Sequence, residues 1–121
     1  MNWNITAGRP VYVQLVEQLE LALVAGEFPP GSRIPPVREL AADAGVNPNT
    51  MQRALAELER TGLVYTQRTA GRFVTEDAAV IDSAKQELAH QQIGAFLHRM
   101  ERMGYDREQT AQLVRSWKEE A

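Results

Sequence analysis

Three polar side chains, Asn49, Gln52 and Arg53, have the chemistry and the spacing needed to read the edges of DNA base pairs. Arg donates two parallel hydrogen bonds to guanine, and Asn or Gln pairs in the same bidentate way with adenine. Interspersed with them is an apolar stripe at helical spacing: Met51, Ala54, Leu55 and Leu58. If that stripe is buried, the helical period places the three polar residues on the opposite, exposed face. An ordinary hydrated helix face is the alternative, and the neighbouring elements must decide between the two.

The two histidines are the other side chains that could carry chemistry. His90 and His98 are eight residues apart, about two turns of a helix, and Glu87 and Glu101 could align with them as a metal site. Hydrated helix residues are the simpler interpretation of this group. The sequence has no cysteine, no His-x-x-x-His pair, no glycine-rich phosphate loop and no nucleophile elbow. We therefore expect a protein that is not an enzyme and needs neither a metal nor a cofactor.

The elements around the polar face have the order of a helix-turn-helix. Asn47 can cap the helix that carries this face, Pro48 suits its first position, and Gly62 ends it. Residues 37–44 favour a preceding helix, which Gly45 terminates. Two helices joined by a turn of about three residues that contains glycine have the spacing of this motif.

The flanking segments complete a winged helix. Residues 10–26 repeat apolar groups with a helical period, and four prolines in residues 28–36 predict a connecting loop. Residues 63–66 and 72–75 are β-prone runs that predict a hairpin, the wing. We therefore predict a mainly α-helical chain with a small β-hairpin, in which residues 1–77 form a winged helix-turn-helix domain.

Residues 78–121 predict a short tail of two helices. The first runs from Ala78 to about Met103, and the second opens at the capping pair Asp106 and Gln109 and continues through Trp117. Their apolar residues are too numerous to remain in water on so small a chain: Ile93, Phe96, Leu97, Met100, Met103, Leu113, Val114 and Trp117. We expect this surface to be buried against the same tail of a second protomer. Folding back onto the winged helix is the alternative.

The charge distribution separates the middle of the chain from its ends. The net charge is −3, but residues 30–75 carry +2 while residues 1–29 and 76–121 carry −2 and −3. We expect weak non-specific attraction to phosphates, which leaves discrimination between DNA sequences to base contacts.

The start of the chain has no secretory signal pattern, and no apolar run reaches the ~20 residues of a membrane span. We expect a cytoplasmic protein that does not enter a membrane.

Residues 9–75 resemble the DNA-binding domain of the GntR family of bacterial transcription regulators. The matching positions, in chain order, are Gly26, Pro30–Pro35, Val37–Ala41, Gly45–Asn47, Thr50, Arg53–Leu55, Leu58–Glu59, Gly62–Val64 and Gly71–Val74. The opening Pro10–Leu15, the stretch Asn47–Ala54 and the two-helix tail are similar to those of the YtrA-like subfamily in particular.

The resemblance implies a recognition helix in the major groove and a wing tip at the minor groove. The implied contacts come from three places, Arg38 in the second helix, the start of the recognition helix and the wing, and comprise Arg38, Asn47, Asn49, Thr50, Gln52, Arg53, Arg68, Thr69 and Gly71. Four neighbours are further candidates: Arg33, Val37, Pro48 and Arg72.

Several of these residues have a purely structural alternative. Arg33 could pin the proline-rich loop to an acidic neighbour instead of contacting a phosphate, and Arg72 could be a solvent-facing strand residue. Arg60 is expected to stabilise the end of the recognition helix, where its charge faces free carbonyls. Tyr65 is expected to pack in the wing or core rather than stack on a base.

The resemblance also implies a homodimeric repressor with a pseudo-palindromic operator and an association with transport operons. One recognition helix reads only about 4 base pairs, so two half-sites roughly one helical turn apart are needed. About 44 residues follow the winged helix, too few to enclose an ordinary ligand pocket within one protomer, so a small-molecule effector would bind at the dimer interface or beside the tail. The alternative function is a winged helix that contacts protein, which should carry aromatic or Met anchors on its exposed face.

Overall fold

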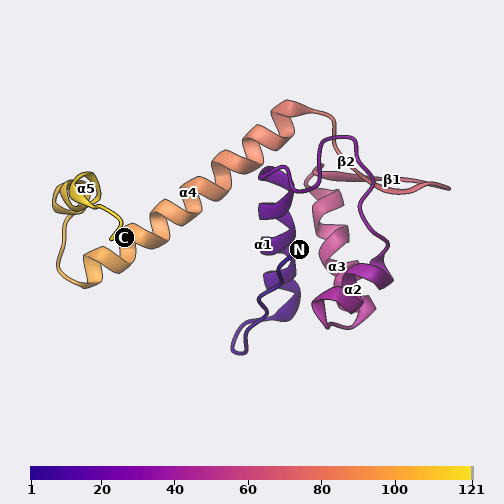
Figure 1. Ribbon diagram of the computed structural model, residues 1–121, viewed down its shortest axis with the longest axis horizontal. Coiled ribbons are helices and arrows are strands. Elements are labelled where there is room, and N and C mark those ends of the chain that lie inside the picture. The colour runs from indigo at the N-terminus through magenta and orange to yellow at the C-terminus, as the bar shows by residue number, and fades with distance from the viewer. Residues whose placement is uncertain (121) are drawn as a thin grey trace. The chain divides into compact units, whose positions relative to one another are not determined.

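The computed structural model describes residues 1–120, and the chain divides into two compact units, residues 1–85 and residues 86 onward. The described elements, in chain order, are α1 (Val11–Val24), α2 (Val37–Ala44), α3 (Pro48–Arg60), β1 (Val64–Gln67), β2 (Gly71–Val74), α4 (Ala78–Arg102) and α5 (Arg107–Ser116) (Figure 1). The mainly helical fold with a single hairpin in this range confirms the predicted winged helix.

The first three helices enclose the core of the first unit. Each residue of this core is at most 5% exposed to solvent. The core consists of Leu15, Leu19, Leu23, Ile34, Leu40, Ala41, Met51, Ala54, Leu55, Leu58, Leu63, Val64 and Val74. The apolar stripe of α3 is part of it, as predicted, and Met51, Ala54 and Leu55 are fully buried. Burying a side chain of this size contributes roughly 1.5–3 kcal/mol. This packing therefore fixes which face of α3 remains exposed.

The turn between α2 and α3 is closed by a glycine and an asparagine. Gly45 has a φ of 70°, a left-handed conformation that residues with a Cβ rarely adopt, and it ends α2. The side-chain oxygen of Asn47 accepts the backbone N–H of Asn49 at 2.7 Å, and Pro48 occupies the first helical position. The predicted end of α2 at Gly45 and the predicted N-cap of α3 at Asn47 are both confirmed.

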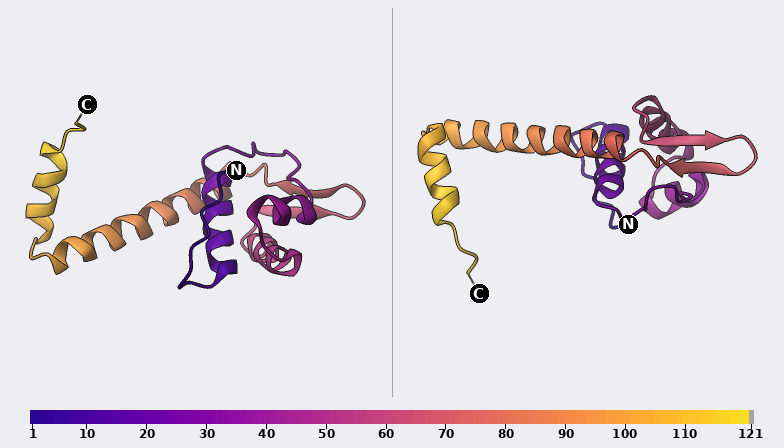
Figure 2. Two further views of the ribbon diagram at one scale, coloured as in Figure 1. Left: turned by 60° about the horizontal axis from the view of Figure 1, so that its bottom comes forward. Right: turned by 90° about the horizontal axis from the view of Figure 1, so that it is seen from above.

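The wing is an antiparallel pair that begins one residue later in β1, and one residue earlier in β2, than the sequence predicts. It projects away from the helices of the first unit (Figure 2). Its second strand also pairs with the proline-rich loop, because Gly31 donates to the Val74 carbonyl, Val74 to Ser32 and Ile34 to the Arg72 carbonyl, at 2.9, 2.9 and 3.0 Å. The loop predicted only as a connection therefore holds the free edge of the wing.

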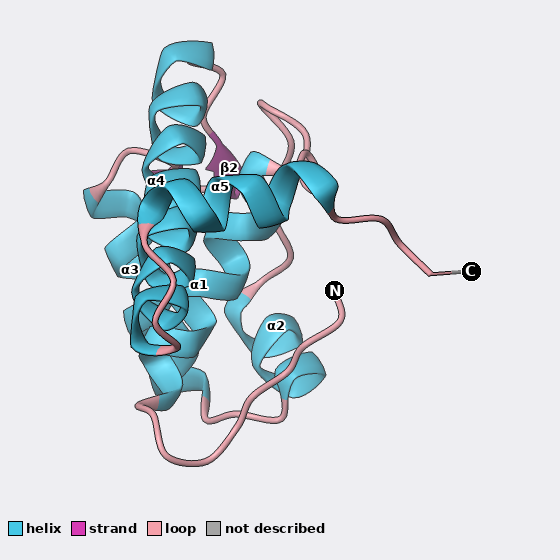
Figure 3. Ribbon diagram, turned by 90° about the vertical axis from the view of Figure 1, so that its left-hand side faces the viewer, coloured by secondary structure: helices cyan, strands magenta, loops and turns pink. Residues whose placement is uncertain are grey.

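The segment before α1 is a loop that passes α2 and turns back to enter α1 (Figure 3). The Asn4 backbone N–H donates to the Gln18 side chain, which donates back to the Asn4 carbonyl, at 2.9 and 2.8 Å. Gln14 is buried and holds Thr6 in the same reciprocal way. The Trp3 indole N–H donates to Asp43 of α2 at 2.9 Å. These contacts tie the start of the chain to both α1 and α2.

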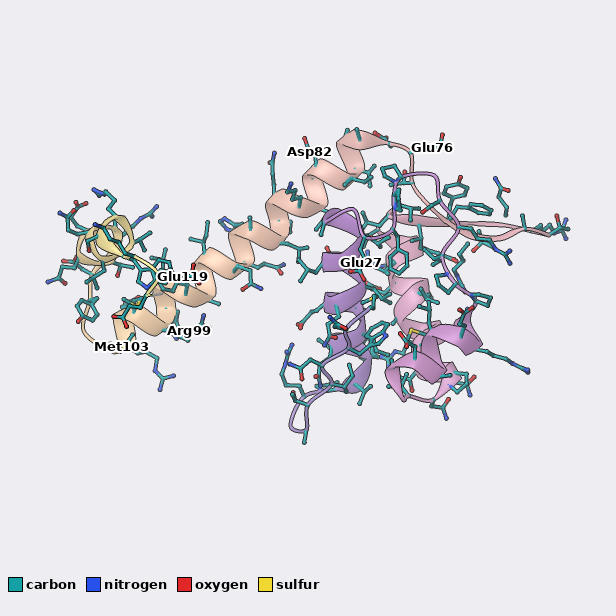
Figure 4. All side chains as sticks on the ribbon, viewed as in Figure 1. Glu27, Glu76, Asp82, Arg99, Met103 and Glu119 are labelled. Carbon is teal, nitrogen blue, oxygen red and sulfur yellow. The ribbon has the colours of Figure 1, made fainter. Side chains whose placement is uncertain are left out.

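The first turns of α4 belong to the first unit. Val80, Ile81 and Ala84 pack against its core, so this unit reaches residue 85 rather than the expected boundary at residue 77. Figure 4 labels Glu76 in the segment before α4 and Asp82 in its first turns. A Cβ added at Gly31 would lie 2.7 Å from Oε1 of Glu76, so this carboxylate covers the proline-rich loop closely.

The second unit contains the rest of α4 and all of α5. Gly104, with a φ of 98°, ends the turn that follows Met103, which Figure 4 labels. Asp106 and Gln109 form the predicted capping box, with bonds of 2.8 and 2.9 Å. The helix ends at Ser116, one residue before the predicted Trp117. Within the described residues, no helix is long and apolar enough to cross a membrane.

Candidate nucleic-acid interface

The first turns of α3 present the polar face that the sequence predicts. Asn47, Pro48, Asn49, Gln52 and Arg53 are exposed. Thr50, at the border of the buried stripe, is half-buried. Because the oxygen of the Asn47 amide is used by the helix cap, its NH₂ group remains as a donor to an external acceptor.

Two further candidate cations lie on other elements of the first unit. Arg38 lies on α2 and Arg68 at the tip of the wing, and both are exposed. Neither makes an ion pair with any carboxylate in the described part of the chain. Thr69 is exposed beside Arg68, and the turn closes with a hydrogen bond of 3.1 Å from Ala70 N–H to the Gln67 carbonyl.

A hollow of about 270 Å³ brings together four candidates from separate elements. It is lined by Arg33, Ile34, Pro35, Pro36, Val37, Thr66, Gly71 and Arg72. Gly71 has a φ of 103°, and a Cβ there would lie 3.0 Å from Nε of Arg33. The Arg33 side chain thus lies across the glycine that opens β2, next to the turn of the wing. It is exposed and forms no ion pair within residues 1–120, so its charge is available to an external anion.

Arg72 is used to attach the wing to α3. Its Nε lies 2.6 Å from Oε1 of Glu59, and its side chain is only 17% exposed, so it is not the solvent-facing strand residue that was the alternative. The Thr66 hydroxyl donates to the same carboxylate. The Thr66 hydrogen bond, followed by the hydrogen bond and charge of Arg72, lowers the pKa of Glu59 against the opposing effect of partial burial.

Arg60 and Tyr65 have the structural roles expected of them. Arg60 lies in the last turn of α3 and pairs with Glu57 one turn earlier at 2.5 Å. Tyr65 stacks on Phe73 of the facing strand, with ring centres 5.8 Å apart. Both side chains are therefore engaged in contacts within the protein.

Arg53 makes a contact that the sequence does not predict. Its guanidinium carbon lies over the ring of Tyr12 on α1, 3.7 Å from the ring centre. The residue is still exposed, so the contact leaves part of its side chain open to solvent. The sequence offers an aromatic residue in the first turn of the helix predicted at residues 10–26, but nothing in it pairs that residue with one particular arginine.

The tail exposes most of the apolar residues selected from the sequence. Ile93, Met103, Val114 and Trp117 are between 56% and 71% exposed, Phe96 and Leu113 are 36% and 42% exposed, and Leu97 and Met100 are half-buried. A hollow of about 420 Å³ in the second unit is lined by Phe96, Met100, Leu113, Val114 and Trp117. The helices of the second unit therefore do not bury this surface by themselves.

The described residues contain no group of three or more His, Asp or Glu side chains that could hold a metal ion. The four residues considered as a metal site, Glu87, His90, His98 and Glu101, are all exposed. Glu87 accepts a hydrogen bond of 3.3 Å from Gln91 on the next turn. They are thus arranged as hydrated residues of α4.

A family model of bacterial regulatory proteins of the gntR family matches residues 11–74, more than half of the chain. The match spans α1 through β2, the elements that carry the candidate interface. The chain belongs to the gntR family. It is a transcription regulator with a DNA-binding winged-helix domain, as the sequence predicts.

Relatives of this GntR-family chain extend the likeness over its full length. YhcF, a helix-turn-helix-type transcriptional regulator of Bacillus subtilis, is 34% identical over 119 residues, 98% of both chains. YtrA, a transcriptional repressor of the same organism, is 41% identical over 69 residues, 57% of this chain and 53% of YtrA. A GntR family regulator from Listeria monocytogenes superposes with a TM-score of 0.85 at 34% identity over 93% of this chain and 99% of the other.

Winged-helix domains of the family bind operator DNA. The DNA-binding domain of AraR, solved in complex with its operator ORE1, superposes with a TM-score of 0.54 at 27% identity and covers 62% of this chain and 93% of that domain.

Proposed function

We propose that this GntR-family regulator is a dimeric repressor that occupies a pseudo-palindromic operator. The observation that carries the proposal is the exposed Asn49, Gln52 and Arg53 face of α3, held in place by a fully buried stripe on its other side. Two or three side chains of these types are what base-edge recognition in the major groove requires. The protein acts by binding rather than by catalysis.

The proposed contacts fall into two classes. Asn49, Gln52 and Arg53 read base edges, while Asn47 and Thr50 at the start of α3 contact phosphates, which the positive end of the helix dipole also favours. Val37 and Pro48 provide apolar contacts beside them. The remaining candidates bind the flanking backbone and the minor groove: Arg33, Arg38, Arg68, Thr69 and Gly71. The last candidate, Arg72, is left out of this set because its guanidinium is held by Glu59. Backbone contacts fix the register, and base contacts select the sequence.

The proposed dimer forms through residues 78–121. Phe96, Val114 and Trp117 line a hollow that a second copy of the tail can fill, and Ile93 and Met103 are further exposed apolar residues of α4 and the turn after it. Dimerisation is also what a two-half-site operator requires of a single recognition helix per protomer. A small-molecule effector of this regulator would bind at the same interface.

Repression of a transport operon is supported by the likeness to YtrA, which is named a repressor, and by the resemblance to the YtrA-like subfamily. A regulator of this kind works where the chromosome is, in the cytoplasm. The alternative function, a winged helix that contacts protein, is disfavoured because the exposed part of α3 has no aromatic or Met anchor.

The test is selection of duplexes by the purified protein from a pool with about 20 randomised base pairs, enough for two half-sites one helical turn apart. We expect an enriched two-fold symmetric sequence, bound far more tightly than its scrambled version in a fluorescence anisotropy titration. Gln52→Ala should weaken the selected duplex and leave the scrambled one unchanged. Glu39→Ala, an exposed change on α2, is the matched control. Failure to enrich any sequence would favour the protein-binding alternative.

A further inference from the structure

The contact between Tyr12 and Arg53 joins α1 to the base-reading face of α3. The guanidinium carbon of Arg53 lies 3.7 Å from the ring centre of Tyr12, well inside the ~6 Å range of a cation–π interaction. No carboxylate in residues 1–120 pairs with Arg53. The aromatic ring is therefore the group that sets the position of this charge.

The helix turn that carries the ring is well packed. Tyr12 is half-buried in the first turn of α1, and Gln14 and Leu15, which follow it, are among the least exposed residues of the first unit. Gln14 also anchors the segment before the helix through its bonds to Thr6. An arginine on a helix surface normally samples many rotamers, but one stacked on a fixed ring loses most of that freedom before any ligand arrives.

Stacking leaves the hydrogen-bonding edge of the guanidinium unused. The ring covers one face of the planar group, whereas the N–H donors lie in its plane and point outward from its edge. Arg53 remains exposed in this position. One side chain can therefore rest on Tyr12 and present two parallel donors to a guanine at the same time.

We propose that Tyr12 is a positioning residue for base recognition, which holds the guanidinium of Arg53 in the orientation that pairs with a base. The inference rests on the proposed function, since it requires α3 to read bases. Base preference at the position that Arg53 reads then depends on a residue of α1, outside the helix-turn-helix. Pre-ordering of this kind improves affinity because less side-chain entropy is lost on binding.

The stack can be tested in the free protein by NMR of the Arg53 side chain. Ring currents of Tyr12 should shift the Arg53 δ and ε protons upfield. Tyr12→Phe, which keeps the ring, should retain that shift, and Tyr12→Leu, which keeps an apolar group of similar bulk, should remove it. Identical Arg53 shifts in the wild-type protein and Tyr12→Leu would overturn the inference.

The effect on recognition is tested with the wild-type-selected duplex and its single-base variants. Tyr12→Leu should bind the selected duplex roughly three- to tenfold more weakly and lose preference at one base pair per half-site, while Tyr12→Phe should stay within about twofold of the wild-type protein. In an Arg53→Ala background, Tyr12→Leu should cause no further loss.

A merely structural Tyr12 would give a different pattern. Equal weakening on every duplex, or the same loss with and without Arg53, contradicts the positioning role, as does a Tyr12→Leu variant that binds like the wild-type protein. Failure of the wild-type protein to enrich any sequence is a separate result, since it contradicts the proposed function before any variant is compared.

Discussion

At the scale of single residues, the arginines of the first unit differ in what holds their charges. Arg72 and Arg60 are paired with carboxylates of α3, at 2.6 and 2.5 Å, and serve the structure. Arg33, Arg38 and Arg68 have no such partner within residues 1–120. A guanidinium that is paired with a carboxylate must break that pair before it can bind a phosphate. The three unpaired arginines should therefore supply most of the attraction for DNA.

Arg53→Ala and Arg33→Ala should therefore weaken DNA binding in different ways. Loss of a bidentate base contact at Arg53 should cost about 1–3 kcal/mol on the selected duplex and relax the preference for one base pair. Loss of a phosphate contact at Arg33 should weaken all duplexes alike and reduce the salt dependence of binding by about one counterion. Anisotropy titrations at several salt concentrations measure both effects. If Arg53→Ala changed neither affinity nor preference, the assignment of the α3 face would be wrong.

The sequence alone was enough to place the exposed side chains of α3, but not their partners. The exposure of Asn49, Gln52 and Arg53 follows from the period of one helix, which depends only on neighbouring residues in the sequence. The contacts of Arg53 with Tyr12 and of Arg72 with Glu59 join residues in different elements. Their existence depends on how helices and hairpin pack, and charge pattern in the sequence cannot select between several equally plausible partners.

At the scale of elements, the wing is held from two sides. On one side, the carboxylate of Glu59 on α3 accepts hydrogen bonds from Thr66 of β1 and Arg72 of β2. The other side is the backbone of residues 31–34, which extends the hairpin by bonds to Val74 and Arg72. The four prolines identified this stretch as irregular, but its bonding partners are about 40 residues away, so the pairing could not be predicted.

Acid should loosen the wing before it unfolds the helices. Because the pKa of Glu59 in the folded protein lies below its unfolded value, its carboxylate contributes stability above the ordinary pKa of about 4.3, and this contribution disappears as the pH falls through the lowered pKa. We expect faster amide exchange in β1 and β2 as the pH approaches that range, after correction for the intrinsic pH dependence of exchange.

Glu59→Gln should show the same loosening at neutral pH, because a neutral amide cannot attract Arg72. Glu57→Gln is the matched control, since it removes a carboxylate of α3 that pairs with Arg60 and does not contact the wing. Amide exchange followed by NMR distinguishes the two variants. Equal protection of the wing in the wild-type protein and Glu59→Gln would show that the backbone pairing holds the hairpin without this ion pair.

At the scale of the whole molecule, the first unit carries the proposed DNA-binding surface and the second unit carries the proposed dimer surface. The net charge of −3 is spread so that the positive excess lies in residues 30–75, which include α2, α3 and the wing. The apolar residues of the second unit could be recognised in the sequence because large side chains such as Phe96 and Trp117 are unfavourable in water on otherwise polar segments. They are exposed in the single chain, and the surface that would cover them could not be predicted from its sequence.

Phe96→Asp should convert the proposed dimer into monomers, because a carboxylate buried in an apolar interface without a partner costs several kcal/mol. Sedimentation velocity gives the mass of the species in solution. Gln92→Asp adds the same charge at an exposed polar position of α4 and should leave the dimer intact. A Phe96→Asp protein that sediments as a dimer would exclude this surface as the interface.

The central claim, that two copies of α3 read two half-sites, is tested most directly by hydroxyl-radical footprinting of the purified protein on the DNA upstream of its own gene. We expect two protected clusters with two-fold symmetry, about one helical turn apart. Protection of a single cluster, or uniform weak protection without preferred sites, would contradict it.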